Sequence, residues 1–406
     1  MNHNLNNKRF GMQRYYKNPR YMNFFLSFLP LPPFCIFAQK RNIMATTINT
    51  TFSSIYLTSH LPEEISITTD QASVEVSVFL NSSAVFSSVY YPYEGEVTVR
   101  DIRSIVESHM SELRYSMTTL RIEAKESEVK PEAVTYDEEG NMHISFDETI
   151  SEPVIESTDD INVVFSRFKS TVSTEYFLRT HFMTTRKSAL IPRRASMNLS
   201  YCADESEEGL NYAIIHYSTP TRPSQILSCS HMFEGSSFDS STIVSNSLSH
   251  AYFKSLVDRV MKIDSIVHGV EYHIGSRHFN LFFTDEQPSD SFTFQNAFNL
   301  LETVNLFGTT TIKTEVNHSE AVCGHKTQFY DETISKKYEV ETAPLQYDEA
   351  KWLSEMLTSR YVTRQIDTFT QAQVLISDIT SEVTDSDKDL IRLKFTWKYA
   401  DGSQWL

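Results

Sequence analysis

A period-two alternation of apolar and polar residues is the feature of this sequence that most constrains its fold. It is clearest near the C-terminus, where the alternate apolar residues are Ile391, Leu393, Phe395, Trp397 and Tyr399. Arg392, Lys394, Thr396 and Lys398 stand between them. Because successive side chains of a strand point to opposite faces, this pattern predicts a strand with one core face and one basic, solvated face.

The rest of the chain favours the same fold class. Ser and Thr together make up 88 of the 406 residues, and aromatic residues make up 12%. Such a composition, with abundant Val and Ile, is typical of strands. Apolar residues with helical spacing occur in only three places, at 102–113, 253–261 and 348–357. The sequence therefore predicts a mainly β protein of two β-sandwich-like domains with about three short amphipathic helices, the first of them capped by Asp101.

The charge distribution separates the amino terminus from the remainder. Residues 1–43 contain seven basic and no acidic side chains, together with an apolar run broken by prolines. We interpret this segment as a disordered or mis-assigned extension, with a cleaved export signal as the alternative. We expect a β domain with one helix at 44–160, with an acidic excursion or projecting hairpin at 125–160. A β-rich domain is expected at 161–406, with a division near residue 290 as the alternative.

Residues 44–406 hold 29 basic and 52 acidic side chains, a net charge of −23. Such a surface repels phosphate, which argues against tight nucleic-acid binding but suits the wall of a channel through which DNA passes. The basic exception is the acid-free stretch 176–203. We expect it to contact an acidic neighbouring subunit through Arg186, Lys187, Arg193 and Arg194, with nucleic-acid binding as the other interpretation.

The ten glycines have no P-loop or dinucleotide spacing, and no motif of a serine hydrolase or zinc protease is present. We therefore expect no enzyme activity and no cofactor, although an unrecognised carboxylate pair leaves a hydrolase as a distant third hypothesis. His318, Cys323 and His325 are weak zinc candidates because their gaps of five and two match no zinc-finger spacing. We expect strands around a turn at Gly324 rather than a metal site.

Two histidines are predicted to face each other across a hairpin. His273 and His278 flank the turn Gly275-Ser276, so their imidazoles are close enough to share a metal ion. A third ligand would have to come from elsewhere, and cross-strand polar packing is the favoured interpretation. The series Asp385, Asp387 and Asp389 lacks the glycine of a calcium loop and predicts a turn.

The C-terminal third carries a resemblance. The stretch FQNAFNLLETVNLFGTTTIKTEVNHSEAVCGHKTQFYDETISKKYEVE and the later VLISDITSEVTDSDKDLIRLKFTWKYADG are similar to poorly characterised phage and prophage structural proteins of gut bacteria. The similarity covers mainly Phe292 to Gly402 and resembles tail-tip or baseplate hub components. It implies a ring-forming virion protein, assembled in the host cytoplasm, whose partners are further copies and other tail proteins.

The competing hypothesis is a secreted or surface β-sandwich module for carbohydrate binding or adhesion. Its candidate aromatic platforms are Trp352, Trp397 and Trp405. Neither hypothesis includes a membrane span, because the prolines break the only long apolar run.

Overall fold

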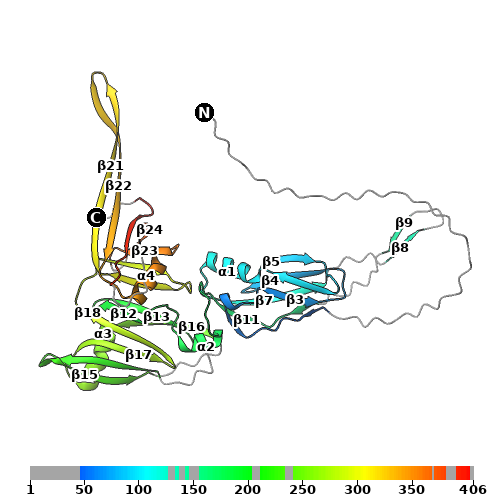
Figure 1. Cartoon of the computed structure of the whole chain (residues 1–406), viewed down its shortest axis with the longest axis horizontal. Helices are drawn as coiled ribbons and strands as arrows, with labels where there is room; N and C mark the ends of the chain where they lie inside the picture. The colour runs from blue at the N-terminus through cyan, green and yellow to red at the C-terminus, as the bar shows by residue number, and fades with distance from the viewer. Residues whose placement is uncertain are drawn as a thin grey trace, which may run out of the picture. The chain divides into compact units, whose positions relative to one another are not determined.

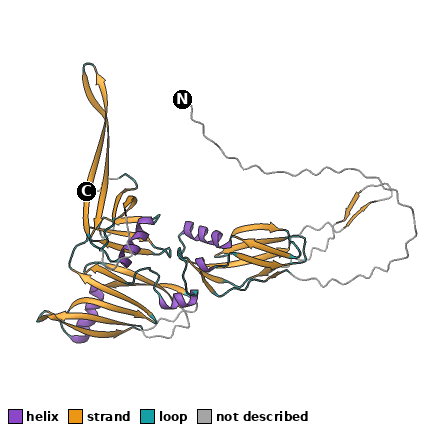
Figure 2. Ribbon diagram, in the orientation of Figure 1, coloured by secondary structure: helices purple, strands orange, loops and turns teal. Residues whose placement is uncertain are grey.

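The computed structural model describes residues 46–126, 133–136, 142–145, 155–203, 211–233, 241–367, 370–380 and 390–402 (Figure 1). It confirms the mainly β prediction, since strands arranged in several sheets dominate the described residues (Figure 2). The expected segment 1–43, the aspartates at 385–389 and Trp405 lie outside the described residues. Within the described ranges, no helix has the length and apolarity needed to cross a bilayer.

The N-terminal sheets enclose one hydrophobic cluster. A three-stranded sheet has the order β1-β3-β6, with β1 (Thr47–Ile48), β3 (Glu64–Thr68) and β6 (Glu96–Arg100). A second sheet has the order β2-β11-β7-β4-β5, with β2 (Ile55–Leu57), β11 (Ile161–Val164), β7 (Met117–Glu126), β4 (Val74–Leu80) and β5 (Ser83–Tyr90), and β10 (Ile155–Ser157) also pairs with β7. The short 3-10 helix η1 is Thr58–His60. Alternate residues of β4 and β7 are buried in the cluster, as the period-two pattern predicts.

The central sheets form a second core. The five-stranded sheet has the order β12-β18-β17-β14-β15, with β12 (Ser188–Pro192), β18 (Arg277–Thr284), β17 (Ile266–Ile274), β14 (Tyr212–Thr219) and β15 (Arg222–Met232). β13 (Ser196–Ala203) pairs with β16 (Thr242–Ser249). Phe253, Tyr272 and Phe279 belong to the cluster that these strands share with a helix.

The C-terminal sheet has seven strands in the order β20-β19-β23-β24-β25-β22-β21. The strands are β20 (Leu301–Leu306), β19 (Asp290–Gln295), β23 (Val362–Gln365), β24 (Gln371–Thr380), β25 (Lys394–Tyr399), β22 (Lys326–Thr342) and β21 (Gly308–Cys323). Its core contains Phe292, Trp352 and Trp397. A fourth cluster, which includes Leu57, Phe177 and Phe298, joins residues from all three parts of the chain, and the domain boundaries proposed from the sequence stay a prediction.

The described residues contain four α-helices, of which three follow the predicted stripes. These are α1 (Ile102–Leu113), α3 (His250–Met261) and α4 (Tyr347–Thr358). The expected cap of α1 is wrong in detail, because Asp101 has a left-handed backbone (φ 66°) and makes no side-chain capping bond. The additional helix α2 (Thr174–Thr180) begins after Ser173, whose side chain accepts a hydrogen bond from the Tyr176 amide.

The acidic excursion contains an antiparallel strand pair. β8 (Ala133–Tyr136) and β9 (Met142–Ser145) pair antiparallel, as a hairpin requires.

In the final strand, the five alternate apolar residues are all buried, but Thr396 on the face predicted to be solvated is only 7% exposed. That part of the prediction is wrong because the short side chain of Thr396 lies between Glu339 of β22 and Ser377 of β24, whereas the longer side chain of Lys394, which is also flanked by both strands, reaches solvent.

Candidate functional site

The most unusual feature of the described structure is the length of the hairpin β21–β22 (Figure 1). β25 pairs with β22 only from Tyr338 to Glu341. Residues 312–337, which we call the arm, therefore extend beyond the part of β22 that β25 covers. Within the described chain, residues 313–337 pair only with one another, and Ile312 pairs with Tyr338. Nearly all of their side chains are exposed. The arm is thus a two-stranded ribbon without a core of its own.

The two faces of the arm differ in polarity near its base, at residues 312–316 and their partners 334–338. Val316 lies opposite Ile334, and Ile312 lies opposite Tyr338, so these apolar residues share one face, with the polar pair Thr314–Lys336 between them. Ile312 is 60%, Val316 43% and Ile334 40% exposed. The other face carries the ion pairs Lys313–Glu339 and Lys337–Glu315, the second with a distance of 2.9 Å between Nζ and Oε1. The distal arm adds further exposed apolar residues, namely Val322, Phe329 and Tyr330.

The weak zinc candidates all lie on this arm. His318 stacks on Phe329, with ring centroids 4.3 Å apart, and Cys323 is exposed beside the predicted turn at Gly324. A register shift after Ser319 separates His318 from Cys323 and His325. Among the described residues, these three side chains do not form a group of neighbouring ligand atoms.

Arg186, a predicted subunit contact, is instead buried inside the chain. Its guanidinium lies 4.0 Å from the centre of the Trp352 ring, and its Nε is 3.7 Å from Glu302 Oε2. The same carboxylate accepts hydrogen bonds from Trp352 Nε1 at 2.7 Å and from Asn296 Nδ2 at 2.6 Å. Burial lowers the pKa of Arg186, while Glu302 opposes that shift. This group stabilises the contact between the central and C-terminal sheets, because Asn296 also donates to the Met183 carbonyl.

The other three contact candidates lie nearer the surface. Arg193 Nη1 pairs with Asp285 of the same chain, 2.7 Å from Oδ2. Lys187 and Arg194 are exposed. The structure thus separates these residues from Arg186, and a contact between subunits through Lys187 or Arg194 stays a prediction.

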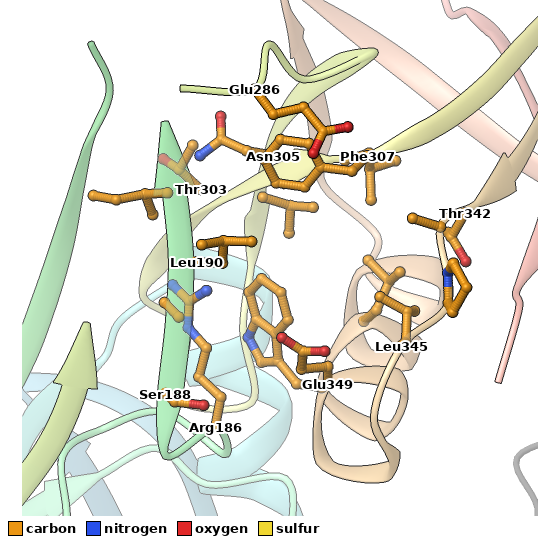
Figure 3. A pocket seen from close by; sticks show the side chains of 18 residues that line it. Arg186, Ser188, Leu190, Glu286, Thr303, Asn305, Phe307, Thr342, Leu345 and Glu349 are labelled. Carbon is orange, nitrogen blue, oxygen red and sulfur yellow. The ribbon is translucent and has the colours of Figure 1, made fainter. Parts of the chain in front are cut away.

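A cavity of about 190 Å³ lies beside Arg186, where β12, β20 and α4 meet (Figure 3). Leu190, Phe307 and Leu345 line it together with the carboxylate of Glu349. The Glu349 carboxylate accepts a hydrogen bond from the Gln346 amide in the capping box of α4, so it has a structural role there. The cavity is smaller than the usual range of about 300–1,000 Å³ for ligand pockets, so we do not assign a substrate to it.

The aromatic platforms expected for a carbohydrate module are mostly buried. Trp397 is 0% and Trp352 8% exposed, whereas Trp405 lies outside the described residues. Neither described indole can therefore present its face to a sugar.

Comparisons of the chain with protein-family models, curated proteins and solved structures give no match.

Proposed function

We propose that this protein is a structural assembly component in which the arm of one copy packs on the body of the next. The observation that carries the proposal is the arm itself, residues 312–337, with its exposed apolar face. A two-stranded hairpin alone in water is at best marginally stable. A ribbon of this length therefore gains stability when another surface covers it.

A second copy of this chain is the partner that the charges favour. Residues 312–337 contain four lysines and four carboxylates, a net charge of zero, whereas residues 44–406 carry −23. Two bodies of that charge repel each other, but a neutral arm can approach an acidic body without this penalty. The arm thus provides a contact between copies whose remaining acidic surfaces repel each other.

The edge strand β15 is the receiving surface that suits the arm best. Within the described residues β15 pairs on one side only, with β14, so its other edge offers unpaired backbone groups. It contains Arg222 and no acid, and Ile226 and Met232 are 63% and 54% exposed. Strand addition at this edge would combine backbone hydrogen bonds with apolar contacts.

When each copy gives its arm to one neighbour and receives an arm from another, the contact is heterologous. Such contacts close into rings or continue as helical tubes. This outcome agrees with the virion tail-tip or baseplate hub expected from the resemblance, in which an acidic lumen would let DNA pass without adhering. The narrower proposal is therefore a ring component of a phage or prophage tail.

Shortening the arm tests the proposal. Since Ile312 and Tyr338 are directly paired, an Asn-Gly turn can replace residues 313–337 and close the hairpin at that pair. We expect the full chain to form oligomers in sedimentation velocity and electron microscopy. We expect the shortened variant to be a monomer whose circular dichroism still shows the remaining sheets.

Ile226→Lys in β15 provides an independent disruption, and Leu390→Lys, at a residue 70% exposed outside both surfaces, is the matched control. We expect the first to weaken assembly and the second to leave it unchanged. A full chain that stays monomeric at high concentration would refute the proposal, and glycan binding by that monomer would favour the carbohydrate module instead.

A further inference from the structure

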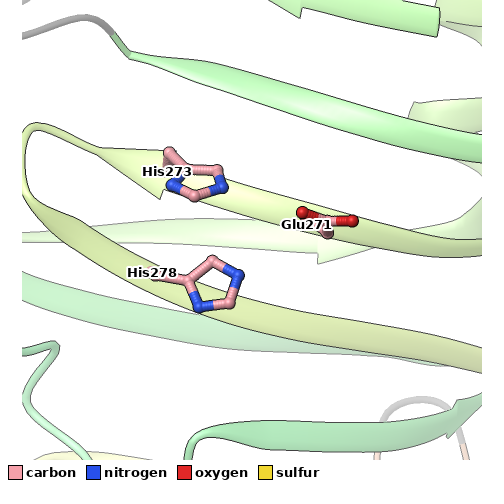
Figure 4. A group of neighbouring side chains, drawn as sticks. All are labelled: Glu271, His273 and His278. Carbon is pink, nitrogen blue, oxygen red and sulfur yellow. The ribbon is translucent and has the colours of Figure 1, made fainter. Parts of the chain in front are cut away.

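The outer face of the central sheet brings together a carboxylate and two imidazoles that are far from the arm in sequence (Figure 4). Glu271 and His273 belong to β17, and His278 belongs to β18. One ligand atom of each residue lies within 4.8 Å of the others. These three residues, which we call the His-Glu cluster, are partly or fully exposed to solvent.

The local sequence explains why these side chains meet. Residues two apart in a strand share a face, which places Glu271 beside His273. The tight turn at Gly275, whose φ is 55°, puts His273 directly opposite His278 in the register of β17 and β18. The turn therefore brings the two histidines together, and the alternation of side chains along β17 adds Glu271 as the third ligand.

Neighbouring residues restrict the positions of the cluster. The Tyr212 ring stacks on His273, with centroids 4.4 Å apart and planes inclined by 10°. His216 Nε2 lies 2.9 Å from Glu271 Oε1, and its Nδ1 lies 2.9 Å from the Ser228 hydroxyl. In one arrangement, the Ser228 hydroxyl donates to Nδ1 and Nε2 donates to Glu271. Hydrogen bonds of this kind orient ligating carboxylates in metal sites.

We propose that Glu271, His273 and His278 bind a divalent transition-metal ion of the zinc type through two imidazole nitrogens and one carboxylate oxygen. Two nitrogens and one oxygen are a ligand set that Zn²⁺ accepts, with a fourth position left for water or another ligand. The side chain of His278 is exposed, so an ion from solution can reach the cluster. The two imidazoles lie against each other with ring centroids 4.6 Å apart and planes inclined by 34°, so metal binding requires both rings to rotate until their nitrogens converge with the Glu271 carboxylate.

The protonation of His273 is compatible with binding. Burial lowers its pKa, and the nearby His278 lowers it further, while Glu271 opposes the shift. A neutral imidazole has a free nitrogen lone pair, so less proton release accompanies metal binding.

Calorimetric titration of the full chain with Zn²⁺, after removal of metals by a chelator, tests the site. The informative variant is His278→Phe, which keeps an aromatic ring against His273 but removes the ligand nitrogen. We expect it and Glu271→Gln each to weaken Zn²⁺ binding about 100-fold or more. We expect His216→Ala, which removes only the orienting hydrogen bond, to weaken binding about 10- to 100-fold.

The double variant Cys323→Ser with His325→Ala is the control, because it removes other potential ligands on the arm. It should leave the Zn²⁺ affinity unchanged. The proposal is overturned if His278→Phe binds Zn²⁺ as tightly as the native chain, if the native chain does not bind Zn²⁺, or if the control variant abolishes binding. In the first two cases, the histidines serve only cross-strand packing.

Discussion

Replacement of Trp397 by alanine removes one of the largest fully buried side chains of the described structure. A buried Trp→Ala change costs about 3–5 kcal/mol of unfolding free energy. The ring stacks on Tyr338 with centroids 3.9 Å apart and planes 4° apart, which favours the upper part of this range. Its Nε1–H has no partner in the described structure, and its removal restores about 1 kcal/mol. We therefore expect a net loss of about 4 kcal/mol for Trp397→Ala.

Urea denaturation followed by far-ultraviolet circular dichroism measures this loss. Because the chain has several hydrophobic cores, unfolding can show more than one transition, and the transition that Trp397→Ala shifts is fitted separately. Trp397→Phe retains an aromatic ring and removes the unpartnered donor, so we expect a loss of only about 1–2 kcal/mol. The adjacent exposed Lys398→Ala should change stability by less than about 0.5 kcal/mol. Equal losses for Lys398→Ala and Trp397→Ala would refute the assignment of faces in the final strand.

Two further predictions concern the base of the arm and the pH dependence of stability. At Gly308 (φ 149°), an added Cβ would clash with the Glu341 carbonyl oxygen. Gly308→Ala should therefore lower the unfolding free energy measured by urea denaturation by about 2 kcal/mol or more. The control Gly324→Ala has open space around it, so it should cost only about 1–2 kcal/mol, which is the cost of its positive φ. Burial and nearby positive charges lower the pKa of His250 below its usual value of 6.5, so the unfolded chain binds more protons than the folded chain below that pH. The unfolding free energy should therefore fall as the pH drops below about 6.5, and His250→Gln should flatten this dependence in denaturation measured at pH 5 to 8; an unchanged slope would contradict the assignment to His250.

Periodicity predicted the elements that bury one complete face. The alternation in β4 and β25 and the helical stripes of α1, α3 and α4 all correspond to elements of the structure. The helix α2 was missed because its seven residues are too few to show a stripe, although Ser173 followed by Glu175 is a typical helix start. Periodicity also treats every polar position as solvated, which is wrong for Thr396 in the interior of a wide sheet.

The arm and the His-Glu cluster could be predicted only in part. A polar, threonine-rich sequence indicates strands at 308–342, but whether neighbouring strands cover them depends on the pairing of β25, which involves only four residues of β22. The facing of His273 and His278 followed from the turn between them. The choice of Glu271 among 52 acidic residues required the register and the side-chain positions.

The position of Arg186 shows why a local excess of charge does not identify a surface. A basic side chain surrounded in sequence by other basic residues suggests an external acidic partner, and the acid-free stretch 176–203 encouraged that interpretation. Its partner is Glu302, more than 100 residues away, and the flat guanidinium also packs on the indole of Trp352. A buried charge is retained when it is compensated within the fold, and loss of one partner leaves the other uncompensated. The burial of Arg186 thus places the attraction between the basic stretch and an acidic residue inside one chain.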